Sequence, residues 1–194
     1  MSKAEQTRAY IIEKTAGIFN VKGYAGTSLS DMTEATGLTK GSIYGNFDNK
    51  DEVALAAFDH NLGKVTAIIK SEMQACKTYR DKLLVYVKVY GNFQSYPFPQ
   101  GGCPLLNTAT EADDTHPALK TKVNNALEYW KKTIINLIRE GIVHKEFRKS
   151  TDAEQMALTM MAMIEGSIMI ANVTRNPEYR KQVMRTLKTM IKDL

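Results

Sequence analysis

Few side chains in this sequence stand in patterns that support covalent chemistry. The candidate nucleophiles are Cys76 and Cys103, and the histidines are His60, His116 and His144. None of them lies in an H-E-x-x-H or G-x-S-x-G setting, and no G-x-x-x-x-G-K-[ST] loop is present. No C-x-x-C pair or histidine–carboxylate cluster indicates a metal. We therefore expect no enzyme, no cofactor and no metal site. The remaining enzyme alternative is a Cys103–His116 nucleophile–base pair.

Cys103 has the more reactive setting of the two thiols. It lies in the Gly-Gly-Cys-Pro stretch of residues 101–104, at or just before an expected helix start. The helix dipole and open N–H groups at such a start stabilise a thiolate. One hypothesis is that Cys103 senses oxidants or electrophiles, and the alternative is a small buried residue at a junction. Cys76 has no such setting, and we expect it to be inert.

Short polar residues at expected helix starts suit another task, the binding of phosphates. Thr27 and Ser28 precede one short apolar-periodic stretch, Thr39 precedes the next, and Lys50 opens a longer one. Hydroxyls and N–H donors at such starts are good phosphate partners. The residues expected to face outward on the second of these stretches are Lys40, Gly41, Ser42, Tyr44 and Asn46.

This outward set also matches the chemistry of base edges in the DNA major groove. The Lys40 ammonium can donate to guanine O6 or N7, and the Asn46 amide can pair with adenine. Gly41 would let the helix backbone approach the groove closely. Ile43 and Phe47 are expected to face inward and hold the helix on its core.

Helices must position these residues, because apolar residues recur at helical spacing and no run alternates with period two. Gly23 is expected to end the first helix, and the Pro/Gly-rich stretch 96–104 must interrupt the later ones. We expect about nine helices: 4–21, 29–36, 40–46, 50–75, 79–94, 105–112, 117–140, 153–173 and 177–194. The first three, with a glycine turn between the second and third, match a helix-turn-helix. The prediction is an all-α fold with a helix-turn-helix DNA-binding domain over 1–48 and a larger helical bundle over 49–194.

Composition excludes several other classes. Apolar residues make up 43% of the chain and charged residues 24%, as in ordinary globular proteins. The balance of 26 Lys+Arg against 21 Asp+Glu, a net charge of +5, is compatible with a polyanionic partner without demanding one. The start of the sequence is polar, and residues 156–173 look too short and too polar for a membrane span. We expect a cytoplasmic protein with no membrane partner.

About twenty positions between residues 9 and 55 keep a particular order and spacing: Ile12, Ala16, Phe19, Gly23, Tyr24, Thr27, Ser28, Leu29, Met32, Ala35, Gly37, Leu38, Gly41, Ser42, Ile43, Tyr44, Phe47, Lys50 and Glu52. In type and spacing they resemble the DNA-binding domain of the TetR family of bacterial regulators. Gly45 departs from the family pattern, in which an aromatic or larger polar residue is common. The glycine predicts a third helix that is soft before it meets DNA.

The resemblance implies a ligand-controlled regulator, and we expect it to be a repressor. Its partners would be double-stranded, near-palindromic operator DNA and a small apolar effector, and its last two helices would form a homodimer. The family's roles imply that Tyr44 and Lys50 contact phosphates, and that Lys40, Gly41, Ser42 and Asn46 face bases. The stretch from Gly102 to Glu111 is also similar to relatives that respond to electrophiles. An architectural DNA-binding protein that senses nothing is a third class.

The expected effector site lies among aromatic and methionine side chains, which suit varied apolar ligands. Each of them has ordinary core packing as its alternative. The predicted pocket residues are Tyr90, Phe93, Tyr96, Phe98, Cys103, Leu106, Tyr129, Trp130 and Met163. The basic residues of the last helix are expected to form a solvated face: Arg180, Lys181, Arg185, Lys188 and Lys192.

Overall fold

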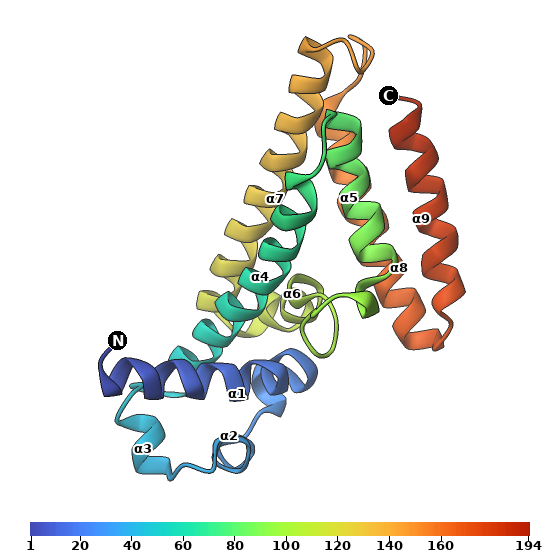
Figure 1. The fold of residues 1–194 in the computed structure, drawn as a ribbon. Helices are drawn as coiled ribbons and strands as arrows, with labels where there is room; N and C mark the ends of the chain where they lie inside the picture. Colours follow the sequence, from blue (N-terminus) through green and yellow to red (C-terminus); the bar gives the residue numbers. More distant parts are fainter. The chain divides into compact units, whose positions relative to one another are not determined.

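The computed structural model describes residues 1–194, and it contains helices and no strands (Figure 1). The elements in chain order are α1 (Lys3–Gly26), α2 (Leu29–Thr36), α3 (Lys40–Tyr44), α4 (Lys50–Gln74), α5 (Tyr79–Gly91), the 3-10 turn η1 (Phe93–Ser95), α6 (Pro104–Thr115), α7 (Pro117–Val143), α8 (Ala153–Thr174) and α9 (Pro177–Lys192). The all-α class and the nine helices are confirmed.

The chain forms two compact units. One contains residues 1–65 and 98–124, and the other contains residues 66–97 and 125–194. The packing thus groups α6 with α1, α2 and α3, although it is far from them in sequence. The predicted boundary after residue 48 separates a DNA-binding domain from the larger helical bundle, and it stays a prediction.

The first unit has a core that α1, α2, α3 and the start of α4 build together. Ile11, Met32 and Ile43 are fully buried in it, with Phe47 and Val53 beside them. Burial of such side chains contributes about 1.5–3 kcal/mol each, which is why these short helices hold their positions.

Local signals define the ends of these helices. Gly23, with φ of 74° and ψ of 178°, breaks α1 as predicted, but one further turn continues to Gly26. Ser28 caps α2, and Asp31 completes a capping box with it. Gly37 takes the left-handed conformation, with φ of 66°, that turns the chain from α2 into α3.

The second unit buries stripes of apolar residues from α5, α8 and α9. On α9 the buried positions include Met184, Leu187 and Ile191. The prediction for Arg180 is wrong, because this residue is buried as well. It lies four residues before Met184, so it continues the buried face of the helix although it is charged.

Helix α8 also differs from expectation in one respect. By length and composition it is long and apolar enough to cross a membrane, contrary to the expectation that this stretch is too short and too polar. That is weak evidence for a membrane, because a buried core helix passes the same test. One face of α8, including Met160, Ile164 and Ile168, is fully buried within the protein.

Candidate nucleic-acid interface and effector site

Helix α3 turns its polar residues outward while its apolar side fills the core. Thr39 caps it, and the Thr39 Oγ1 accepts a hydrogen bond from the Ser42 N–H at 3.1 Å. Lys40 and Gly41 are exposed, whereas Ile43 is fully buried. The outer side therefore offers an ammonium, hydroxyls and bare backbone, which are groups that bind phosphates or base edges.

The two glycines of this segment have different surroundings. A Cβ on Gly41 would meet nothing nearer than the Thr39 Oγ1 at 4.0 Å, so the protein itself does not require glycine there. A Cβ on Gly45 would lie 3.1 Å from the Gly41 carbonyl oxygen. The end of the helix itself therefore favours glycine at position 45, whereas the space at Gly41 is open to a binding partner.

Arg8 of α1 holds the far end of α3. Its guanidinium lies over the Phe47 ring at 3.9 Å, donates to the Asn46 carbonyl, and donates to Glu52 at 2.6 Å. The second Glu52 oxygen accepts the Asp48 N–H at 2.8 Å. The Asp48 N–H and then Arg8 hold the pKa of Glu52 below its usual range. Sequence reasoning missed Arg8, because forty-four residues separate it from Glu52.

Asn46 takes part in the same end of the helix. Its Nδ2 donates to the Ser42 carbonyl at 2.9 Å. A bidentate contact to adenine uses both the donor and the acceptor of the amide. Base reading by Asn46 therefore requires its amide to turn away from Ser42.

Lys50 sits at the start of α4 in an aromatic and acidic cluster that the sequence did not reveal. Its ammonium lies 4.3 Å from the Tyr24 ring centroid. The Tyr24 hydroxyl donates to Asp51, and this bond raises the pKa of Tyr24 to about 12. The His116 ring packs edge-on against Tyr24, with 4.4 Å between centroids. A cation–π contact leaves the Lys50 N–H donors available for a phosphate. Tyr44, the other predicted phosphate contact, is half-buried beside the core.

Thr27 and Ser28 have opposite exposures. Ser28 is exposed and caps α2, so its hydroxyl is at the surface. Thr27 is fully buried, and its hydroxyl donates to the Gly23 carbonyl at 2.6 Å. The Thr27 side chain therefore stabilises the α1–α2 corner and presents no hydroxyl to a phosphate, contrary to the role expected for it.

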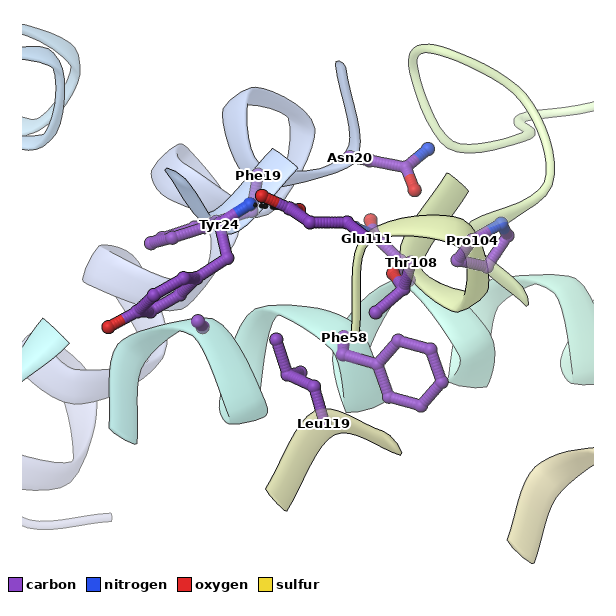
Figure 2. A pocket seen from close by; sticks show the side chains of 10 residues that line it. Phe19, Asn20, Tyr24, Phe58, Pro104, Thr108, Glu111 and Leu119 are labelled. Atoms are coloured by element: carbon purple, nitrogen blue, oxygen red, sulfur yellow. Dashed lines mark hydrogen bonds between the residues drawn. The ribbon is translucent and has the colours of Figure 1, made fainter. Parts of the chain in front are cut away.

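Helix α6 is fastened to the end of α1 by side chains that accept and donate backbone hydrogen bonds. The Glu111 carboxylate accepts the Tyr24 N–H at 2.6 Å (Figure 2). It also accepts the Ala25 N–H at 2.7 Å. Asn20 Nδ2 donates to the Gly102 carbonyl at 3.0 Å, and Asn107 Nδ2 donates to the Asn20 carbonyl at 2.9 Å. The two bonds to the Glu111 carboxylate are charge-assisted, and such bonds are about twice as strong as neutral ones. We call these three side chains, Asn20, Asn107 and Glu111, the α6 clamp.

Six predicted pocket residues belong to the second unit. Tyr90 and Trp130 are buried and stack at 5.8 Å between ring centroids. Phe93, Tyr96 and Met163 are half-buried. Tyr129 is 60% exposed, and its assignment to a pocket is wrong for this structure. Adjacent residues on a helix point about 100° apart, so Tyr129 faces solvent while Trp130 faces inward.

The other three belong to the first unit. Phe98 and Leu106 are half-buried, and Cys103 is 1% exposed at the N-cap of α6. The predicted place of Cys103 at a helix start is confirmed. The two nitrogens of His116, the residue considered as a base for Cys103, have other neighbours. Nδ1 accepts the Leu119 N–H at 3.2 Å, and Nε2 lies 3.8 Å from Asp51.

The surface of the second unit has a groove elsewhere. It is lined by Glu72, Cys76, Leu84, Lys88 and Lys188, among others, and by none of the predicted pocket residues. Burial raises the pKa of the Cys76 thiol, in keeping with the inert role expected for it. No group of three or more metal-binding side chains is present.

Two family models match this chain. Residues 11–57 match the family described as bacterial regulatory proteins, tetR family. Residues 80–187 match the family described as tetracyclin repressor-like, C-terminal domain. The first covers the helix-turn-helix, and the second covers more than half of the chain.

Individual relatives agree with both matches. A TetR-family transcriptional regulator from Cytophaga hutchinsonii is 52% identical, with a TM-score of 0.95 over 98% of this chain and 96% of its own. The probable HTH-type transcriptional regulator ArpR of Pseudomonas putida is 44% identical over 86% of this chain and 80% of its own length. The HTH-type transcriptional repressor DhaR of a Mycobacterium species is 26% identical over 88% and 85%.

Proposed function

Because the chain belongs to the TetR family of bacterial transcriptional regulators, we propose that it is a homodimeric repressor released from its operator by a small effector. The observation that carries this proposal is the outer side of α3. Lys40 and Gly41 are exposed there over a buried Ile43, and Arg8 fixes the helix end. A helix that is held rigidly by its core and exposed along one side can enter a major groove.

In the proposed complex each group has a definite task. Lys40, Gly41, Ser42 and, after its amide turns, Asn46 face base edges. Ser28, Thr39, Tyr44 and Lys50 contact the phosphates that flank the groove. Thr27 contributes through the corner that it stabilises. The expected half-sites are about one helical turn of DNA apart, or a multiple of it.

The dimer interface is proposed on α8 and α9. Leu158, Met169, Ile170 and Val173 of α8 are 50%, 51%, 41% and 80% exposed in the single chain. Apolar side chains that recur on one helix without cover mark an interaction surface. A second copy packed through the last two helices would bury them.

The α6 clamp supports the proposal of ligand control. It ties α6 to the backbone at the end of α1, and α1 in turn holds α3 through Arg8. An effector that displaces α6 would therefore act on the helix that positions the reading surface. A tenfold preference of the effector for the DNA-free state corresponds to about 1.4 kcal/mol of coupling.

Kinship with known regulators bears on enzymatic activity and location. The relatives are regulators, so we propose no enzymatic activity and a cytoplasmic location. Cys103 is 1% exposed, so an electrophile could reach it only after the chain opens. We therefore favour non-covalent effector binding over thiol chemistry.

The test of the proposal is selection of bound duplexes from random DNA by the purified protein, followed by titration across a salt series. We expect a near-palindromic sequence, tight binding and a steep fall of affinity with salt. Weak binding that is equal on all duplexes, from protein shown by mass spectrometry to carry no ligand, would contradict it.

A further inference from the structure

The first turn of α9 buries a cation that no anion accompanies. Arg180 is only 4% exposed, on the helix face that also carries Met184 and Leu187. A guanidinium has five N–H donors. The Arg180 Nε–H has no hydrogen-bond partner and no ion pair reaches the group. Its contact is the face of the Phe93 ring, 4.1 Å from the guanidinium carbon.

Such burial is unfavourable in the chain as it stands. Burial alone lowers the pKa of Arg180, and no neighbouring carboxylate opposes that effect. Buried charges are normally paired, because desolvation costs more than a single cation–π contact returns. The exposed arginine on the same helix, Arg185, does not carry this cost. A buried cation kept without a counter-ion is expected where a ligand supplies one.

A second buried donor lies near the same end of α5. Trp130 is 7% exposed, and its Nε1–H has only the Tyr86 hydroxyl as a neighbouring acceptor, without the geometry of a full hydrogen bond. Its indole stacks on Tyr90, which is one helical turn before Phe93 along the chain. The unpartnered Arg180 Nε–H and a weakly held indole N–H, from α9 and α7, therefore border one run of aromatic side chains.

We propose that Arg180 binds the anionic head group of the effector, a small apolar acid of the carboxylate class. The two carboxylate oxygens match the planar fork of the guanidinium. The apolar body of the ligand would lie against Phe93 and Tyr90, and Trp130 would donate to an oxygen acceptor on it. This inference rests on the proposed function, and it specifies the expected apolar effector as an apolar acid.

The experiment compares two fluorescent probes with the same rings on the full chain without DNA. Anilinonaphthalene sulfonate carries an anionic group, and phenylnaphthylamine does not. Both are titrated into the wild type, Arg180→Met, Arg180→Lys and the control Arg185→Met, an exposed arginine on the same helix. Trp130 is the single tryptophan, so energy transfer from it reports whether the probe binds nearby. Naphthoate and uncharged naphthamide then compete for the bound probe.

We expect Arg180→Met to weaken the anionic probe by at least about tenfold, and to leave the neutral probe within about twofold. Arg180→Lys should be intermediate, because it keeps the charge and loses the fork. Naphthoate should displace the probe and naphthamide should not. The thermal midpoint of unliganded Arg180→Met should be unchanged or higher, since a buried unpaired charge is removed and the stem contacts are kept.

Other results would overturn the proposal. These are no binding of the anionic probe to the wild type, equal losses for both probes, or a lowered thermal midpoint with unchanged probe binding. Loss of the dimer with unchanged probe binding would show that Arg180 pairs with a second copy instead. If Arg180→Met does not fold, the Arg180→Lys titration decides. Every measurement uses DNA-free protein, so failure here leaves operator binding a separate question.

Discussion

Replacing Gly41 by alanine separates the stability of α3 from its use as a reading surface. The new methyl group would meet nothing nearer than the Thr39 Oγ1 at 4.0 Å, and the backbone of Gly41 is not in the left-handed region. Alanine is favoured over glycine in a helix by about 1 kcal/mol. Gly41 is the second residue of a short helix, so we expect the free energy of unfolding to rise by about 0.5–1 kcal/mol.

Operator binding should change in the opposite direction. If the α3 backbone lies against the DNA at Gly41, the methyl group occupies space that the groove needs. In the proposed dimer this clash occurs once in each half-site. We expect affinity to fall at least about tenfold, which is about 1.4 kcal/mol, in a protein that is more stable than the wild type.

The assay pairs urea unfolding, followed by circular dichroism, with fluorescence anisotropy on a labelled operator at fixed salt. Gly63→Ala is the matched control, because it adds a methyl group to an exposed position of α4 with nothing within 4 Å. It should raise stability similarly and leave DNA binding alone. A stabilised Gly41→Ala variant that binds DNA like the wild type would refute the close approach of the α3 backbone to the groove. A destabilised variant would refute the conclusion that the space around Gly41 is open.

Three further predictions concern the same surface and its supports. Lys40→Ala should reduce discrimination at one base pair by about 1–3 kcal/mol, whereas Tyr44→Ala should weaken all duplexes alike; titrations on single-base operator variants distinguish the two. Glu111→Gln should lower the free energy of unfolding by about 1–2 kcal/mol through the α6 clamp, and the exposed Asp114→Asn, measured by the same urea titration, should not. Lys22 and Ser28 hold the pKa of Asp31 well below its usual range. The contribution of the Asp31 carboxylate to stability is therefore complete above the unfolded pKa of about 3.9, and it is lost as the pH falls. With Asp31→Asn the free energy of unfolding should fall less steeply below about pH 4. An unchanged dependence on pH in this range would contradict the prediction.

The sequence by itself determined the class of the protein, the nine helices and most of their ends. These follow from interactions within a few residues, such as the Ser28 capping box, the left-handed Gly37 and the break at Gly23. Helical periodicity also placed Ile43 and Phe47 inward, and so made Lys40 and Gly41 the outward residues. Local geometry is sufficient for such predictions, because the positions along one helix are related by a fixed angle.

Contacts between distant segments came only from the tertiary structure. Arg8 with Glu52, and Glu111 with the backbone after Gly23, join residues 44 or more positions apart. No local pattern pairs them. The charge of Arg180 predicted exposure, but its place four residues before Met184 buried it against Phe93. Thr27 and Tyr129 were misplaced for a related reason: whether a side chain near a helix end or beside a buried neighbour meets solvent depends on what packs over it. Helix formation is local, whereas burial and pairing depend on the whole chain.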